Sequence, residues 1–287
     1  MVLEFIGKMP ELQVNQRILA IVVTYYPERE LLEKNISAFI EDVDKVLIWE
    51  NTPTREKMSY RFIEHEKVEY CGDGINSISH GLNYAWRYAN TYGYDYLLTM
   101  DQDSVFHNFA VFKEYVFTHS DRMLLFGPLI NPKSISTQPS VRKEESLITS
   151  GMLIQICILN TLGGYDEKLD IDGIDTDLCL RANQLGIDSY RIVHSGLQQR
   201  FGSPLIKYYK GMKQEITCYP PKRLKSIVAA HIYLIRKYPN MSPRMKKLID
   251  NDFIKGKIKR ILLFEDRKIQ KIIAILLGIY KGKRMKI

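Results

Sequence analysis

The sequence lacks the patterns that mark zinc-binding, secreted and membrane-spanning proteins. Its 287 residues contain only four cysteines, which lie far apart without a Cys-x-x-Cys pair, so neither a zinc finger nor a disulfide framework is indicated. The longest uncharged apolar run near the C-terminus, residues 272–280, is well short of the roughly 20 residues that a spanning helix needs. Residues 1–16 lack the basic start and apolar core of a secretory signal. We therefore expect a cytoplasmic protein.

Common nucleotide-binding and metalloprotease motifs are also missing. The chain has no G-x-G-x-x-G, no P-loop and no H-E-x-x-H sequence. What it has is an ordinary globular composition, 45% hydrophobic and 26% charged, in a length that suits one large domain plus an appendage. An enzyme of this size is possible.

Acidic residues are scarce in the last part of the chain. Residues 205–287 contain 22 Lys and Arg against 5 Asp and Glu, whereas the preceding residues contain 19 against 28. This asymmetry predicts an acidic body and a basic tail. We divide the chain into a lead-in of residues 1–16, a domain of residues 17–203 and a basic helical region of residues 204–287.

Apolar runs and helical spacing alternate along the first half of the chain. Residues 18–24 are a continuous apolar and β-branched run, typical of a strand buried on both faces, and further strands are predicted at 45–49, 68–71 and 94–100. Segments 27–40 and 75–92 have helical spacing between them. This order predicts an α/β fold with a mostly parallel, doubly wound sheet, whose ligands bind beyond the carboxyl ends of the strands.

The second half of the chain predicts fewer strands and longer helices. Strands are expected at 124–126, 147–156 and 190–193, and a helix at 175–185. Beyond Pro204 the alternation stops, and residues 222–238 and 254–280 have helical spacing.

Two carboxylates follow the strand that ends at Met100. Asp101 and Asp103 would emerge together at the ligand-binding edge of the sheet, where paired carboxylates can hold Mg²⁺ or Mn²⁺ against a diphosphate. An Asx turn or a helix cap explains the same residues equally well.

A second acidic cluster, Asp170, Asp172, Asp175 and Asp177, leads into the helix predicted at 175–185. A capped, acid-rich first turn, with Asp175 as the N-cap, is the simpler interpretation. Four carboxylates so close together repel one another, which is tolerable if one of them is a general base or if a cation lies nearby. His194, after the last predicted strand, is a candidate metal ligand, although satisfied or exposed histidines are more common.

An ordered series of motifs carries a resemblance. The segments are Ala20-Ile-Val-Val-Thr-Tyr25, Trp49-Glu-Asn-Thr52, Gly74-Ile75, Leu97-Leu-Thr-Met-Asp-Gln-Asp-Ser104, Thr149-Ser-Gly151, Gly163-Gly-Tyr-Asp-Glu167 and Asp175-Thr-Asp-Leu-Cys-Leu-Arg181. Over residues 17–202 the chain resembles family 2 glycosyltransferases, and most closely their bacterial rhamnosyltransferase-like branch. Segments within 219–239 and 264–282 resemble the helical tail of that branch.

The resemblance implies a Rossmann-like A-type glycosyltransferase (GT-A) fold, in which residues 17–203 form the nucleotide-sugar-binding catalytic domain. The implied reaction transfers a sugar from a nucleotide diphosphate to an acceptor hydroxyl with inversion. dTDP-rhamnose is the favoured donor, with UDP-galactose, UDP-galactofuranose or UDP-glucose as alternatives.

The resemblance also implies roles for individual residues. Asp175 matches the catalytic base, with Asp172 and Asp177 in support and Arg181 neutralising the cluster. Asp101 and Asp103 would hold the divalent cation. The positions matched to donor binding are Thr24, Tyr25, Glu50, Asn51, Gly74, Asp101, Gln102 and Asp103.

Some positions depart from the family pattern. Glu50 stands where Asp is usual, and Gln199 where many relatives have a metal-binding His, so the third ligand is left open between His194 and none. Ala229 and Ala230 replace an Arg-Asn pair of the tail.

The basic tail admits three interpretations. Its Lys and Arg residues flank apolar residues on a helix too short to span, which predicts peripheral binding to an anionic membrane at the cytoplasmic face. The acceptor would then be a glycan or a polyprenyl-diphosphate-linked glycan. Alternatively, the same apolar face packs on the catalytic domain. A nucleic-acid-binding tail is the third interpretation, but the chain shows no nucleic-acid-binding motif.

Overall fold

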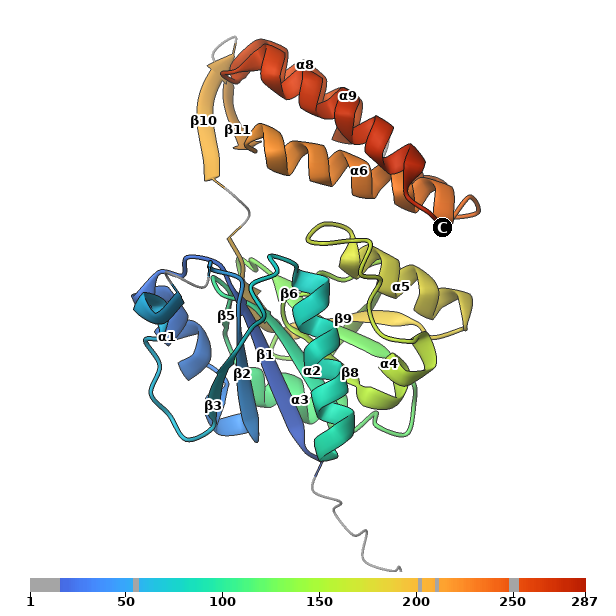
Figure 1. The fold of residues 1–287 in the computed structure, drawn as a ribbon. Coiled ribbons are helices and arrows are strands. Elements are labelled where there is room, and N and C mark those ends of the chain that lie inside the picture. Colours follow the sequence, from blue (N-terminus) through green and yellow to red (C-terminus); the bar gives the residue numbers. More distant parts are fainter. Residues whose placement is uncertain (1–15, 54–56, 201–202, 210–211, 248–252) are drawn as a thin grey trace, which may run out of the picture.

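A computed structural model describes residues 16–53, 57–200, 203–209, 212–247 and 253–287 of the chain. The lead-in predicted for residues 1–16 lies outside these ranges except for Gln16. In Figure 1 a sheet with helices on both sides forms the lower part of the molecule, and a hairpin and further helices form the upper part.

The main sheet has a parallel half and a mixed half. The parallel half has the order β3-β2-β1-β4, formed by Val68–Cys71, Lys45–Glu50, Ile18–Thr24 and Tyr96–Asp101. In the mixed half, β8 (Met152–Gln155) pairs antiparallel with β4 and β6 (Leu125–Ile130), and β6 pairs parallel with β9 (Ser189–Gln198). Two short strands, β5 (Val105–Phe106) and β7 (Val141–Glu144), pair antiparallel with β9.

Helices cover both faces of the sheet, as the sequence predicts. Alternate residues of β1 enter two separate cores, Leu19 and Ile21 in one and Ile18 and Val22 in the other. The first core is covered by α2 (Ile78–Tyr92), α4 (Ile156–Leu162) and α5 (Ile174–Gln184). The second is covered by α1 (Arg29–Ser37) and α3 (Phe109–Phe117). Because both faces of β1 are buried, its sequence is apolar throughout.

Several elements differ from the sequence prediction. Of the segment 147–156 that was expected to be one strand, only Met152–Gln155 (β8) is a strand, and Ile156 already begins α4. A short apolar run is compatible with either strand or helix. Helix α3, the β10–β11 hairpin (Ser203–Tyr209 and Met212–Cys218) and the 3₁₀ turns η1 (Ile40–Asp42) and η2 (Lys57–Tyr60) were not predicted. Helix α2 begins at Ile78 and not at Ile75, with Ser77 as the N-cap. Its last residue is Tyr92, and Gly93, in the left-handed conformation, is the C-cap.

The C-terminal region contains α6 (Pro221–Lys237), α7 (Pro243–Lys247), α8 (Gly256–Phe264) and α9 (Lys268–Arg284). The single helix expected at 254–280 is therefore two helices. The carboxylate of Glu265, buried in the turn between them, binds Lys257 Nζ at 2.7 Å and Lys271 Nζ at 2.9 Å. These contacts fix the turn between α8 and α9. In the described part of the chain, no helix is long and apolar enough to cross a membrane.

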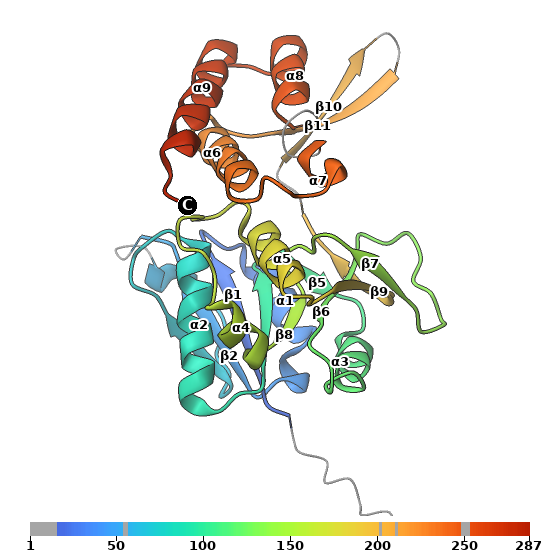
Figure 2. The same ribbon diagram turned by 90° about the vertical axis from the view of Figure 1, so that its right-hand side faces the viewer.

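Helix α6 joins the C-terminal region to the domain that contains the main sheet. Its Tyr233 and Leu234 belong to the same core as α5, whereas its Leu224 and Val228 form a small core with α8 and α9. Helix α9 lies directly against α6, because a Cβ added at Gly278 would approach the Lys225 carbonyl oxygen to 2.7 Å. Figure 2 shows α6 between α9 and the domain that contains the main sheet.

Candidate active site

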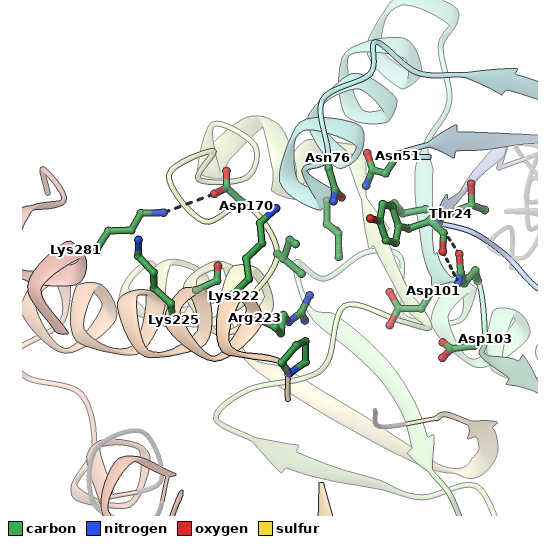
Figure 3. Close-up of a pocket in the computed structure, with 17 residues that line it drawn as sticks. Thr24, Asn51, Asn76, Asp101, Asp103, Asp170, Lys222, Arg223, Lys225 and Lys281 are labelled. Atoms are coloured by element: carbon green, nitrogen blue, oxygen red, sulfur yellow. Dashed lines mark hydrogen bonds and ion pairs between the residues drawn. The ribbon is translucent and has the colours of Figure 1, made fainter. Parts of the chain in front are cut away.

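A cleft of about 750 Å³ opens at the carboxyl ends of β1, β2 and β4. The sheet side contributes Thr24, Tyr25, Asn51, Asp101, Gln102 and Asp103. The C-terminal helices contribute Lys222, Arg223, Lys225 and Lys281 to the opposite side (Figure 3). The residues on the sheet side lie at the carboxyl ends of the strands, where the sequence predicts the ligand-binding edge. These four basic side chains were not predicted to line the cleft, because they lie more than a hundred residues after Asp103 in the chain and belong to no local motif.

Backbone contacts hold the loops of the sheet edge together. The Asn51 amide donates to the Thr24 carbonyl at 2.8 Å. The Tyr25 amide donates to Gln102 Oε1 at 2.6 Å, and Gln102 Nε2 donates to the Tyr25 carbonyl at 3.2 Å. These contacts place four of the predicted donor-binding residues on one surface.

Two other predicted donor-binding residues do not line the cleft. Glu50 is 4% exposed, and its carboxylate receives two hydrogen bonds from Arg61, at 3.1 and 2.7 Å. Gly74 lies outside the cleft, whereas Asn76, two residues later in the same turn, lines it. Donor contacts of Glu50 and Gly74 stay predictions.

Asp101 belongs to a closed ring of hydrogen bonds. Gln199 Nε2 donates to Asp101 Oδ2 at 3.0 Å, and the Ser104 hydroxyl donates to Gln199 Oε1. The ring continues through Ser150, whose hydroxyl donates to Ser104 Oγ at 2.7 Å and accepts from the Asp101 amide at 3.0 Å. Burial, together with the like charge of Asp103, raises the pKa of Asp101 to about 6.

The carboxylates of Asp101 and Asp103 fit a divalent cation. Burial raises the pKa of Asp103, and the negative charges of the two residues repel, so a bound cation would stabilise both ionised forms. Mg²⁺ and Mn²⁺ accept one or two carboxylates and complete their shell with phosphate and water oxygens. Among the residues that the structure describes, no group of three His, Cys, Asp or Glu side chains converges on a metal position.

His194 is not brought to these carboxylates. Its ring packs on Tyr115 with centroids 5.0 Å apart, and its Nδ1 lies 3.1 Å from the Ser140 amide. The prediction placed His194 beyond a strand that ended at Val193, but β9 continues to Gln198. The histidine therefore lies within the strand, and its proposed role as a metal ligand is wrong for this structure.

Asp172 and Asp175 line a second hollow, of about 610 Å³, which shares Asp101, Asp103 and Arg223 with the cleft. Gly173, in the left-handed conformation, is the N-cap of α5. Asp175 is therefore in the first turn and is not the cap that the sequence predicted. Burial raises the pKa of Asp175, while the Thr176 amide, 2.7 Å from Asp175 Oδ1, opposes this shift.

Asp172 connects this hollow to α6. Its Oδ1 accepts a hydrogen bond from Arg223 Nη2 at 2.8 Å, and its buried Oδ2 has no hydrogen-bond partner among the described residues. Burial raises the pKa of Asp172 to about 6, although Arg223 acts in the opposite direction. Asp170 lies at the rim of the cleft, 4.0 Å from Lys281.

Asp177 faces away from the cleft. Its side chain is fully buried and binds Lys237 Nζ and the Tyr238 hydroxyl, both at 2.6 Å, and Arg181 Nε at 2.8 Å. The predicted supporting acid therefore attaches α5 to the end of α6. Arg181 neutralises this one carboxylate and not the whole cluster.

We expect Asp177→Asn to lower the free energy of unfolding by about 3 kcal/mol, because Arg181 loses the counter-charge of the fully buried Asp177 and Lys237 keeps only Asp166 as a partner. Urea denaturation measures this change. The matched control is Asp188→Asn, which breaks a more exposed ion pair with Lys143 and should cost less than about 1 kcal/mol. Equal effects of the two substitutions would contradict the anchoring role of Asp177.

Comparisons with known proteins agree with this architecture. No family model matches the chain. Over 232 residues it is 25% identical to the dTDP-rhamnosyl transferase RfbF of Shigella flexneri. The matched segment covers 69% of the chain and 78% of RfbF.

Two solved structures have similar folds at low identity. The S. aureus TarS fragment 1–349 in complex with UDP-GlcNAc is 11% identical, with a TM-score of 0.55 over 92% of the chain and 82% of the fragment. GalNAc-T7 with UDP, GalNAc and Mn²⁺ is 12% identical, with a TM-score of 0.57 over 81% of the chain. The match spans 53% of the GalNAc-T7 chain, about half its length. The chain has a GT-A glycosyltransferase fold. Together, the relative and the two structures support a glycosyltransferase, as the sequence predicts.

Proposed function

We propose that the chain is an inverting, metal-dependent glycosyltransferase of the family 2 type, which moves a sugar from a nucleotide diphosphate to an acceptor hydroxyl. The observation that carries this proposal is the pair of connected cavities. Asp101 and Asp103 line both, Thr24 and Asn51 line the first, and Asp175 lines the second. The GT-A fold favours this activity over the nucleic-acid-binding alternative.

The proposed reaction is a single displacement at the anomeric carbon. The acceptor oxygen forms a bond to that carbon while the bond to the departing phosphate oxygen breaks, and Asp175 takes the proton of the acceptor hydroxyl. Asp101 and Asp103 would hold the cation, which would offset the negative charge that develops on the nucleotide diphosphate. Asp172 would support the base by holding the Arg223 guanidinium at the site, 2.8 Å from Asp172 Oδ1, but would not receive the proton.

We propose dTDP-rhamnose as the donor, with support from the similarity to RfbF. UDP-galactose, UDP-galactofuranose and UDP-glucose are the alternatives. Thr24, Tyr25 and Asn51 would contact the nucleoside, and the ring of Tyr25, which is 48% exposed, is available for stacking.

Hydrolysis of nucleotide sugars in the absence of an acceptor tests this function. We expect release of dTDP from dTDP-rhamnose to be the fastest reaction in a panel that includes the three UDP-sugars. Faster hydrolysis of one UDP-sugar would transfer the assignment to that donor. Failure to hydrolyse or bind any nucleotide sugar would contradict the proposed function.

We also propose that the acceptor is a glycan or a polyprenyl-diphosphate-linked glycan of cell-surface polysaccharide synthesis, and that the protein acts at the cytoplasmic face of the membrane. Lys222, Lys225 and Lys281 support an anionic acceptor, since they line the side of the cleft opposite the sheet. The side-chain ammonium groups of Lys222 and Lys225 form no hydrogen bond or ion pair with another described residue, and both line the cleft.

A further inference from the structure

Helix α9 has apolar residues on two opposite sides. One side, which includes Ala274, Ile275 and Gly278, is buried against α6 and α8. The other side carries Ile269, Ile273, Leu276, Leu277 and Tyr280, which are between 47% and 77% exposed. Their spacing of i, i+4, i+7, i+8 and i+11 places them in one stripe along the helix.

The end of α8 also carries exposed apolar side chains. Leu262 and Leu263 are 53% and 46% exposed. Together, these seven side chains of α8 and α9 form the outer apolar face. Figure 1 and Figure 2 both show α8 and most of α9 at the end of the molecule farthest from the main sheet. The outer apolar face is thus not the side of α9 that packs on α6, and nothing in the described part of the chain covers it.

Basic residues surround the outer apolar face. Lys259 and Arg260 of α8 and Lys268, Lys283 and Arg284 of α9 are exposed. The two acids of the connecting turn are already paired, Glu265 with Lys257 and Lys271, and Asp266 with Lys271 at 2.9 Å. The remaining charge around the face is therefore positive.

We propose that the outer apolar face of α8 and α9 docks on an anionic lipid bilayer. Large apolar side chains on one face of a helix, with Lys and Arg beside them, are typical of helices that lie in the membrane interface. A lipid surface of negative charge complements the basic rim. A second copy of the chain is disfavoured as the occupant, because it would bring two basic rims together.

One end of the outer apolar face lies close to the lysine side of the cleft. Lys225 and Lys281 line the main cleft and also a smaller hollow of about 450 Å³, whose other walls include Leu277 and Tyr280 of the outer apolar face. The acceptor side of the cleft is therefore continuous with the docked surface. This step rests on the proposed function, since it brings an acceptor carried by a membrane lipid to the lysine side of the cleft.

Vesicle sedimentation of the full chain tests the docking. Vesicles of phosphatidylcholine alone are compared with vesicles that also contain phosphatidylglycerol. We expect stronger binding to the anionic vesicles, and release by salt. The double variant I273E/L276E should bind these vesicles at least roughly tenfold more weakly, because two exposed apolar side chains no longer enter the bilayer and two negative charges face anionic lipid.

The matched control is Met123→Glu, which changes a 40% exposed apolar residue before β6 and should leave vesicle binding unchanged. Lys283→Glu should reduce the preference for anionic vesicles. Binding that is indifferent to anionic lipid, or equal in wild type and I273E/L276E, would overturn the docking. So would light scattering that shows a dimer of the wild type and a monomer of I273E/L276E, since a second copy would then cover the face.

Donor hydrolysis in solution separates this proposal from the proposed function. I273E/L276E should hydrolyse the soluble nucleotide sugar at the wild-type rate, because neither residue lines the cleft. If the wild type hydrolyses nucleotide sugars normally but does not bind vesicles, only the docking proposal is contradicted. If the wild type binds vesicles but hydrolyses no nucleotide sugar, the proposed function is contradicted and the docking proposal is still supported.

Discussion

Asp175→Asn should lower the rate of sugar transfer by roughly 10²-fold or more, because the amide cannot accept the proton of the acceptor hydroxyl. The fold should be retained, since Asn Oδ1 can still accept the hydrogen bond from the Thr176 amide that now reaches Asp175 Oδ1 at 2.7 Å. Loss of a helix cap cannot explain a slow variant, because Gly173 and not Asp175 is the N-cap of α5. Single-turnover transfer measures the effect.

The pH profile gives a second test of the same residue. Burial raises the pKa of Asp175, and below that pKa the carboxyl group is protonated and cannot act as a base. The wild-type kcat should therefore fall on the acid side. The residual rate of Asp175→Asn should lack the part of that fall that Asp175 causes, while Asp101 and Asp172, whose pKa values are raised to about 6, still titrate in the variant. Asp170→Asn, at the half-exposed rim, is the control and should transfer at a near-normal rate. Near-normal transfer by Asp175→Asn would move the assignment to Asp172.

Asp103→Asn should reduce turnover by about two orders of magnitude and weaken binding of Mn²⁺ in the presence of the nucleotide. The reason is that Asp101 and Asp103 are the two carboxylates proposed to hold the cation, so the substitution leaves Asp101 as the single anionic ligand of that pair. Isothermal titration with Mn²⁺ and dTDP measures the binding, and donor hydrolysis measures turnover.

Chelation supplies the control for this prediction. EDTA should abolish turnover of the wild type, and added Mn²⁺ or Mg²⁺ should restore it. Asp121→Asn, an exposed acid outside both cavities, should behave as the wild type. Full activity in EDTA, or in Asp103→Asn, would contradict metal dependence and leave the lysines and Arg223 as the groups that neutralise the diphosphate.

The sequence predicts the sheet edge well because buried parallel strands have a strong apolar signal. The bounds of β1 and β3 are those predicted, and Asp101 and Asp103 lie at the ligand-binding edge. Strand length was harder to predict where polar residues occur within a strand. His194 was misplaced for that reason, because β9 continues through Ser195 to Gln198.

The acidic cluster shows a second limit. Asp175 and Asp177 are two residues apart, so on an α-helix their side chains point about 200° apart, and only one of them can face the cleft. Helix geometry excludes a shared role, but it does not say which residue faces inward. That choice depends on Lys237 and Tyr238, which approach from a helix about sixty residues later in the sequence. Contacts of this kind have no local sequence signal.

The position of α6 in two hydrophobic cores determines how the chain can be divided. A chain ending at residue 203 would lose Tyr233 and Leu234 from the core of the sheet domain, and Asp177 would be buried without Lys237 and Tyr238. It would also lose the entire cationic side of the cleft. The change in composition near residue 204 is therefore not a boundary for truncation. We expect that swapping C-terminal regions between related proteins succeeds only when α5 and α6 are exchanged together.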